Sequence, residues 1–211
     1  FVEGRKMSKS LGNFIRVREF LEEGYDPAAI RHLLISSHYR GELNFTRAGL
    51  KASGVAVQRL IDFEARLSQL ETTDDAEESA LPGLAKKVVL DFRSTMDDDF
   101  NSAGALGVLF GFVTKVNAEL DAKGRVSTSD RDVALGALRS MDKVLGLLEV
   151  AQASRVIDDD LSSWVERMIA ERAQARASRD FARADEIREE LSAKNIVLED
   201  SAEGTRWKVV N

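Results

Sequence analysis

Apolar side chains recur at helical spacing along most of this chain, and this periodicity constrains the fold more than any other feature. Between residues 102 and 122, for example, Leu106, Leu109 and Val113 fall on one face of a helix. The 211 residues include only two prolines, which interrupt helices, and they are rich in alanine, leucine, arginine and glutamate, which favour them. We therefore expect a mainly α-helical fold.

The expected elements follow one another along the whole sequence. Asp26 followed by Pro27 is a typical helix start, and Thr46 is placed to cap a long helix. We expect helices over residues 18–23, from 27 onward, and over 46–70, 84–98, 102–122 and 129–148. The last three are expected to form an antiparallel bundle. Residues 71–83, acidic and without a basic residue, predict a solvated linker, and residues 149–159 a second break. Two further helices, marked by Trp164 and Ile187, then precede a β-hairpin of residues 196–198 and 207–210.

Composition disfavours several kinds of site. The chain has no cysteine, which excludes disulfides and thiolate metal ligands. Its two histidines, His32 and His38, lie near no carboxylate cluster at ligand spacing, and we expect His32 to lie in a packed helix interface. Residues 97–99 are three aspartates whose side chains diverge on a helix, so Asp99 or Asn101 more plausibly caps the next helix. No apolar run approaches the roughly 18 residues that span a membrane. We expect neither a metal site nor a membrane segment.

The stretch from Lys6 to Ser10 has the composition of a phosphate-binding loop. It reads Lys-Met-Ser-Lys-Ser and continues as Leu-Gly-Asn. The ammonium groups of Lys6 and Lys9 are compact charges with three donors each, suited to offsetting phosphate charge. Ser8, Ser10 and Gly12 offer hydroxyl and backbone N–H donors without bulk. Two lysines three residues apart would also fit a solvated turn, but the whole stretch predicts a mobile loop that closes over a polyphosphate.

Further motifs follow this loop in a fixed order. They read His-Tyr-Arg at 38–40 with Leu-Asn-Phe at 43–45, Met-Asp-Asp-Asp-Phe-Asn at 96–101, Asp-Phe-Ala-Arg-Ala-Asp-Glu-Ile-Arg at 180–188, and Gly-Thr-Arg-Trp at 204–207. The loop resembles the ATP-handling signature of class I aminoacyl-tRNA synthetases. Together with the later motifs, it makes the chain similar to the cysteinyl-tRNA synthetases over almost its whole length. In that family the adenosine motif and the zinc site precede the loop, whereas only five residues precede Lys6 here. The resemblance therefore implies the C-terminal part of a longer ATP-dependent ligase, inactive when alone.

The resemblance also implies an organisation and a set of partners. The implied segments are the end of the catalytic domain with a stem-contact region (1–45), a connecting helix (46–70), the acidic linker (71–83), a DALR-like helical-bundle domain (84–148) and an anticodon-reading domain (160–211). In the implied reaction, cysteine attacks the α-phosphate of ATP, in the presence of Mg²⁺, and then passes to tRNA(Cys). Zn²⁺ would be bound by residues upstream of this chain. The intact enzyme is expected to be a cytoplasmic monomer that contacts no membrane.

The same resemblance assigns roles to residues of the loop. Lys9 is expected to contact the ATP phosphates and to stabilise the departing pyrophosphate. Lys6 would act similarly or would order the loop, with Ser8 and Ser10 as lesser contributors to ATP binding. This segment needs no catalytic acid or base, because activation depends on positioning and charge stabilisation.

The C-terminal region offers candidates for binding tRNA. They are Arg172, Arg176, Arg179, Arg183, Asp200, Arg206 and Trp207. The first three recur at spacings of four and three, which would place them on one helical face, and arginine both pairs with phosphates and stacks on bases. Trp207 could stack on an unpaired base, and Asp200 could accept a hydrogen bond from a base edge. Arginines among glutamates also form solvated salt-bridged faces, and Trp207 could instead anchor the hairpin, so both alternatives stay open.

Two other functions fit part of the sequence. A cysteine ligase of the mycothiol pathway carries a similar loop, and residues 26–31 would suit it equally well, but it has no need of an anticodon-reading tail. A stand-alone tRNA-binding module without chemistry would have no need of a complete phosphate loop. The two ends of the chain together therefore favour the tRNA ligase.

Overall fold

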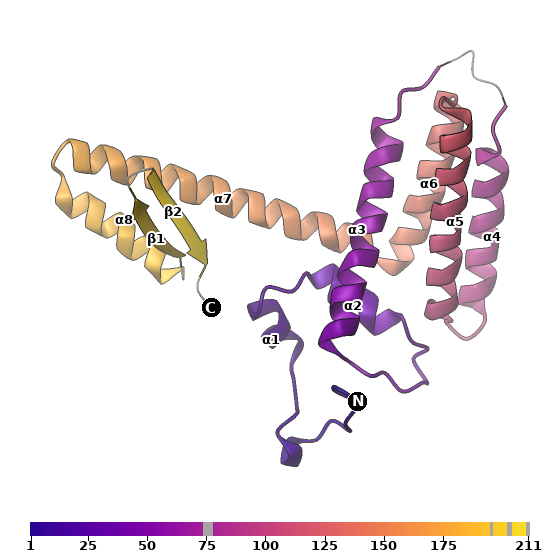
Figure 1. Ribbon diagram of the computed structural model, residues 1–211, viewed down its shortest axis with the longest axis horizontal. Helices are drawn as coiled ribbons and strands as arrows, with labels where there is room; N and C mark the ends of the chain where they lie inside the picture. Colours follow the sequence, from indigo (N-terminus) through magenta and orange to yellow (C-terminus); the bar gives the residue numbers. More distant parts are fainter. Residues whose placement is uncertain (74–77, 195, 202–203, 210–211) are drawn as a thin grey trace. The chain divides into compact units, whose positions relative to one another are not determined.

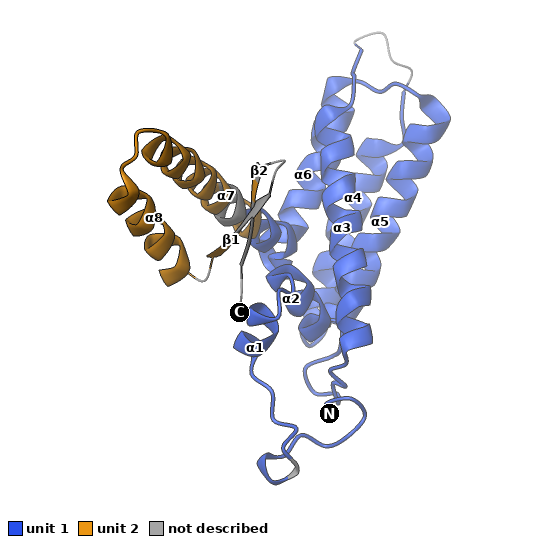
Figure 2. Ribbon diagram, turned by 60° about the vertical axis from the view of Figure 1, so that its left-hand side comes forward, with its two compact units in different colours: residues 1–152 blue, residues 153–211 orange. Residues whose placement is uncertain are grey.

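Eight α-helices account for most of the described part of the chain, which confirms the mainly α-helical fold (Figure 1). The computed structural model describes residues 1–73, 78–194, 196–201 and 204–209, without the side chains at 11, 156–159, 199–201, 204 and 206–209. The chain divides into two units, Phe1–Gln152 and Ala153–Asn211 (Figure 2).

A helical bundle forms the larger part of the first unit. It consists of α3 (Arg47–Gln69), α4 (Leu81–Asp97), α5 (Ser102–Lys123) and α6 (Thr128–Leu145), which run side by side (Figure 1). Phe63, Leu109 and Leu138 are at most 2% exposed in its core, and the rings of Phe63 and Phe112 meet edge to face with their centroids 6.0 Å apart. Burial of such apolar faces against one another is the main source of stability in a bundle.

α5 lies within this core. Its length and composition would allow it to cross a membrane. In the structure, however, Ala105, Leu109, Val113 and Val116 are buried against the neighbouring helices. Its apolar character is therefore accounted for by packing inside the bundle.

A smaller group of elements precedes the bundle. It comprises the 3₁₀ turn η1 (Lys9–Leu11), α1 (Val17–Glu22) and α2 (Pro27–Ile35). Phe20, Ile30, Leu33 and Leu50 form a separate small core that joins α1 and α2 to the start of α3. This core fixes the segment that carries the lysine–serine loop to the bundle.

The caps explain where the helices begin. As predicted, the side chains of Asp26, Thr46 and Asn101 accept backbone N–H groups at the starts of α2, α3 and α5. α4, however, begins at Leu81, so Pro82, which we expected to lie in the linker, occupies its first turn. A proline there removes no helical hydrogen bond, because that N–H would have no partner within the helix.

The linker expected over residues 71–83 lies between α3 and α4, except that its last three residues belong to α4 and that residues 74–77 lie outside the described part of the structure. Its described start is held in place: the Thr73 N–H donates to the Val126 carbonyl at 3.1 Å, and the Thr72 and Thr128 hydroxyl oxygens lie 2.8 Å apart. The break expected at 149–159 contains the boundary between the two units, but it is wrong as an interruption of the helix, since α7 (Leu147–Ala177) runs through it. That stretch contains no proline or glycine, and acidic residues alone do not end a helix.

The second unit contains most of α7, α8 (Phe181–Ala193) and a hairpin, which confirms the expected helix-plus-hairpin unit. Strands β1 (Ile196–Ser201) and β2 (Gly204–Val209) pair antiparallel, with Ile196 opposite Val209 and Ser201 opposite Gly204. Val165, Met168, Ile187, Leu191 and Ile196 form its core.

Candidate functional site

The lysine–serine loop is a compact turn on the first unit. The Ser8 side chain accepts the Ser10 N–H at 3.2 Å and its Oγ lies 2.7 Å from the Ser10 Oγ. Gly12 ends the 3₁₀ turn with a φ of 65°, in the left-handed region that glycine adopts without strain. The loop is therefore held together by short-range bonds in a shape that depends on a small residue at position 12.

Asn13 bonds to the loop from its far end. Its Oδ1 accepts the Ser8 N–H at 2.8 Å, and its Nδ2 donates to the Lys6 carbonyl at 3.0 Å. The side chain of Asn13 therefore bonds to the backbone on both sides of Met7.

The two loop lysines are exposed. The Lys9 ammonium lies 5.9 Å from the centroid of the Phe14 ring, within the range of a cation–π contact. The two ammonium groups and two hydroxyl groups for which the sequence predicts polyphosphate binding therefore lie within five consecutive residues. The structure also brings in Asn13 and Phe14, which the sequence reasoning did not single out.

The start of the chain anchors this loop to the small core. The Glu3 N–H donates to the Phe45 carbonyl at 3.0 Å, and the Phe45 N–H donates to the Phe1 carbonyl at 2.9 Å. Phe45 in turn packs on Phe20 of α1, with ring centroids 4.6 Å apart. The 43–45 motif is thus the support for the residues that lead into the loop.

The His-Tyr-Arg motif meets the triple aspartate in space. The Tyr39 hydroxyl donates to Asp99 at 2.6 Å, which raises the pKa of Tyr39 above its ordinary value, and Arg40 Nε lies 3.3 Å from the same carboxylate. His38 Nε2 is 3.7 Å from Asp99, and its ring stacks on Tyr39. Of the two candidate caps, Asn101 is the one that caps α5, and Asp99 is instead a partner of the 38–40 turn.

His32 lies in a packed interface, as predicted. Its Nδ1 is 3.0 Å from the Ser53 Oγ of α3, and its ring meets Phe110 of α5 edge to face. Burial lowers the pKa of His32 below its ordinary value of 6.5. Across the described residues, no group of three or more His, Cys, Asp or Glu side chains could hold a metal ion.

The arginines of the second unit do not form the single helical face that their spacing predicted. Arg172 and Arg176 lie on α7, the first half-buried and the second exposed. α7 ends at Ala177, and Arg179 adopts a φ of 60° in the turn before α8. The prediction was wrong for Arg179, because Asp180 caps α8 and reverses the chain there.

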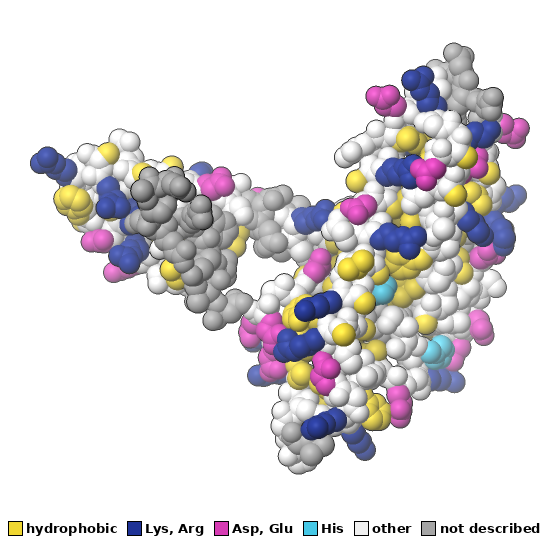
Figure 3. All heavy atoms as spheres, in the orientation of Figure 1, with side chains coloured by type: hydrophobic (Ala, Val, Ile, Leu, Met, Phe, Trp, Pro, Cys, Tyr) yellow, Lys and Arg dark blue, Asp and Glu magenta, His cyan; other side chains and the backbone are white. Residues whose placement is uncertain are grey.

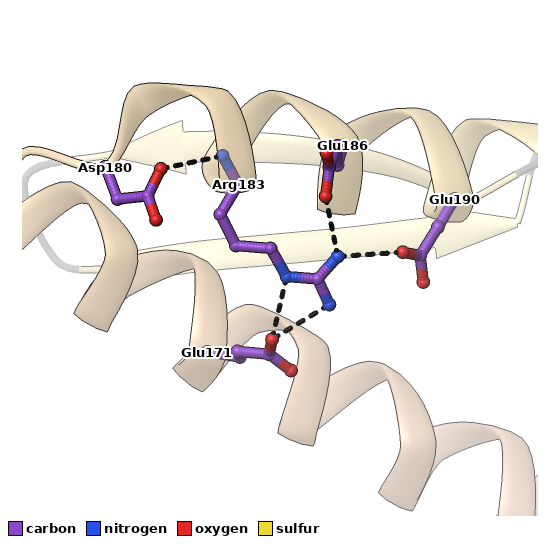
Figure 4. Close-up of polar contacts among 5 residues, drawn as sticks. All are labelled: Glu171, Asp180, Arg183, Glu186 and Glu190. Carbon is purple, nitrogen blue, oxygen red and sulfur yellow. Dashed lines mark hydrogen bonds and ion pairs between the residues drawn. The ribbon is translucent and has the colours of Figure 1, made fainter.

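Arg183 is engaged by three glutamates (Figure 4). Its guanidinium donates to Glu171 of α7 at 3.0 Å, and to Glu186 and Glu190 of α8 at 3.1 Å each. These bonds, that to Glu171 first, raise the pKa of Arg183 above its ordinary value. Arg183 therefore ties α7 to α8, and this contact is not evident from sequence spacing.

The hairpin candidates are located by their backbone only. Trp207 lies opposite Leu198, Arg206 opposite Glu199, and Asp200 opposite Thr205. The side chains of Asp200, Arg206 and Trp207 lie outside the described part of the structure.

One exposed aromatic residue was missed by the sequence reasoning. Phe181, the first residue of α8, is 62% exposed and follows the exposed Arg179 and Asp180. An exposed aromatic ring beside an arginine can stack on an unpaired base. The sequence could have indicated this exposure, because Phe181 directly follows Asp180, the N-cap of α8, and a ring in the first turn of a helix need not be buried.

Charges of both signs share the face drawn in Figure 3. Basic and acidic side chains are interspersed over the helical bundle on this face rather than gathered in one patch. A nucleic-acid contact on this face would therefore depend on particular side chains rather than on a broad basic surface.

Three family models match the chain. The tRNA synthetases class I (C) catalytic domain matches residues 1–54, the DALR domain matches residues 91–149, and the cysteinyl-tRNA ligase anticodon binding domain matches residues 158–207. The order of these matches follows the order of the motifs.

Curated relatives match almost the whole chain. The cysteine–tRNA ligase of Solibacter usitatus is 39% identical over 208 residues, covering 98% of this chain and 43% of the relative. Those of Idiomarina loihiensis and Oceanobacillus iheyensis are 39% and 37% identical, also over 98% of this chain and over 42% and 44% of the relatives. The chain thus spans less than half the length of these relatives.

Proposed function

Because the chain belongs to the cysteinyl-tRNA ligase family, we propose that it forms part of an enzyme that activates cysteine with ATP and attaches it to tRNA(Cys). The observation that carries this proposal is the presence, in one chain, of a complete lysine–serine loop and of a region matching an anticodon-binding domain. By the intact enzyme we mean this chain together with the further residues that its relatives carry.

In this enzyme, the loop acts on the phosphates of ATP. Lys9 contacts the phosphates and stabilises the pyrophosphate as it departs, while Lys6, Ser8 and Ser10 supply further donors. Their charges and hydroxyl groups are suited to negative charge that develops in the transition state, and they need no proton transfer. Mg²⁺ accompanies ATP, and Zn²⁺ is held by residues upstream of this chain, as the family resemblance implies.

The second unit binds the tRNA and reads its anticodon. Arg172, Arg176 and Arg179 supply positive charge for the phosphates, and Trp207, Asp200 and Arg206 contact bases from the hairpin. Phe181 adds an exposed ring at the turn beside Arg179. We place the enzyme in the cytoplasm as a monomer.

The rival functions account for less of the chain. A cysteine ligase of the mycothiol pathway would leave the match over residues 158–207 without a role. A stand-alone tRNA-binding module would leave the lysine–serine loop without one.

The proposal is tested by Lys9→Ala in the intact enzyme. Because Lys9 acts chiefly in the transition state, both kcat and kcat/KM of cysteine-dependent ATP–pyrophosphate exchange should fall about 100-fold or more. The tRNA Kd should stay nearly unchanged. Lys86→Ala, at an exposed lysine of α4, is the matched control.

A tenfold weaker tRNA Kd in Lys9→Ala with normal exchange would contradict the role of Lys9. Clear cysteine-dependent exchange by the 211-residue chain alone, which we expect to be inactive, would contradict the inference that activation needs further residues.

A further inference from the structure

Asn13 is placed to control the shape of the phosphate loop. Its amide accepts the Ser8 N–H at 2.8 Å and donates to the Lys6 carbonyl at 3.0 Å. The two bonded groups lie on either side of Met7, whose side chain is 46% exposed and so is not held in a core. The two hydrogen bonds of Asn13 therefore fix the turn, as a buried apolar side chain fixes other turns by packing.

The two hydrogen bonds involve backbone groups of, or next to, the residues that carry the two ammonium groups. One bond fixes the carbonyl of Lys6, and the other fixes the N–H of Ser8, the residue before Lys9. The Ser8 side chain caps the 3₁₀ turn that begins at Lys9. Loss of either bond would thus let the loop backbone shift, which would change the direction in which both ammonium groups point.

We propose that Asn13 is a positioning residue of the adenylation reaction, which holds Lys6 and Lys9 in place for the polyphosphate of ATP. This inference rests on the proposed function of the loop. Asn13 already donates to and accepts from the loop backbone, so its role is to act through the lysines rather than on substrate. Loss of such preorganisation is costly, since a displacement of about 1 Å can slow a reaction on the order of 100-fold.

The first test is Asn13→Ala in the intact enzyme. We expect kcat/KM for ATP in pyrophosphate exchange to fall by about tenfold or more, with the tRNA Kd and the melting temperature close to wild type. Asn117→Ala is the matched control, because the Asn117 side chain accepts a hydrogen bond from Arg66 at 2.8 Å within the helical bundle, away from the loop and its supports. Equal exchange in Asn13→Ala and Asn117→Ala would overturn the inference.

A double-mutant cycle distinguishes positioning from a separate effect on the fold. If Asn13 acts through the loop lysines, Asn13→Ala should slow exchange by a smaller factor in the Lys9→Ala enzyme than in the wild type, because one of the two positioned groups is already gone. If the double variant instead lost exchange by the product of the two single-variant factors, Asn13 and Lys9 would act independently and the inference would be contradicted. Should Asn13→Ala fail to fold, Asn13→Asp keeps the acceptor for Ser8, removes the donor to Lys6 and adds a negative charge to the loop. Wild-type exchange in that variant would also overturn the inference.

The two variants distinguish failure of the positioning role from failure of the proposed function. If Lys9→Ala has normal exchange, the phosphate-loop assignment itself fails. If Lys9→Ala is slow while Asn13→Ala is normal, only the positioning role fails.

Discussion

His32 couples the stability of the first unit to pH. Its Nδ1 faces the Ser53 hydroxyl at 3.0 Å, and burial lowers its pKa below 6.5 in the folded state. The unfolded chain therefore takes up a proton at a higher pH than the folded chain does. Stability should fall as the pH decreases through 6.5 and should level off below the lowered pKa.

Thermal melting between about pH 7.5 and pH 5 tests this coupling. His32→Gln can retain a hydrogen bond to Ser53 but does not titrate, so its melting temperature should depend less on pH than that of the wild type. An unchanged pH dependence in the variant would assign the effect to other groups.

At the residue scale, the sequence correctly predicted helix caps that depend on the chemistry of neighbouring residues. The caps at Asp26 and Thr46 depend only on neighbouring residues, and both were identified correctly. The partners of Asp99 could not be predicted, because Tyr39 lies 60 residues away and reaches Asp99 only after the bundle has formed. Arg183 was considered for tRNA, while its bond to Glu171 depends on how α8 folds back on α7.

At the element scale, the junction of α6 and α7 depends on one carboxylate. Asp142 is 8% exposed and accepts the N–H groups of Leu147, Leu148 and Glu149 at 2.8, 2.9 and 3.1 Å. It thereby satisfies the first donors of α7, which have no partner within the helix. Sequence rules missed this cap because Asp142 lies inside α6, five residues before the first donor that it binds.

Asp142→Ala should therefore destabilise the first unit. Leaving buried N–H donors without a partner costs about 1–3 kcal/mol, which chemical denaturation can measure. Asp62→Ala, at an exposed position on α3, is the control and should change little. A wild-type free energy of unfolding for Asp142→Ala would show that water replaces the carboxylate at no cost.

The contact between α7 and α8 makes a second prediction at this scale. Arg183→Leu removes the charge that balances Glu171, Glu186 and Glu190, so melting of the second unit should occur at a lower temperature, with a difference that shrinks in high salt. The tRNA affinity should change little at temperatures where the unit is folded. Arg188→Ala, at an exposed arginine of α8, is the control. Weaker tRNA binding at unchanged melting temperature would instead make Arg183 a tRNA contact.

The elements show where sequence patterns reach their limit. Apolar periodicity predicted the bundle helices well, since each buries one face. It failed at residues 149–159, where we expected a break although the stretch contains no proline or glycine. Leu147, Leu148 and Ala151 pack in the bundle core, so tertiary contacts stabilise the start of α7.

At the scale of the whole molecule, the proposed functions fall on different units. The phosphate loop belongs to the unit Phe1–Gln152, and the region matching an anticodon-binding domain lies in Ala153–Asn211. Amino-acid activation should therefore be indifferent to the anticodon, whereas transfer to tRNA should depend on it. The boundary between the two units falls within residues 149–159, where a break was expected, but it lies inside α7 rather than in a linker.

Charging of tRNA(Cys) by the intact enzyme tests the account most directly. Transcripts with the natural anticodon and with one substituted anticodon base would be compared in kcat/KM for aminoacylation, with pyrophosphate exchange measured alongside. Loss of one stacked or paired base costs about 1–3 kcal/mol, so the account predicts roughly tenfold or greater loss of charging with exchange unchanged. Equal charging of the two transcripts would contradict it.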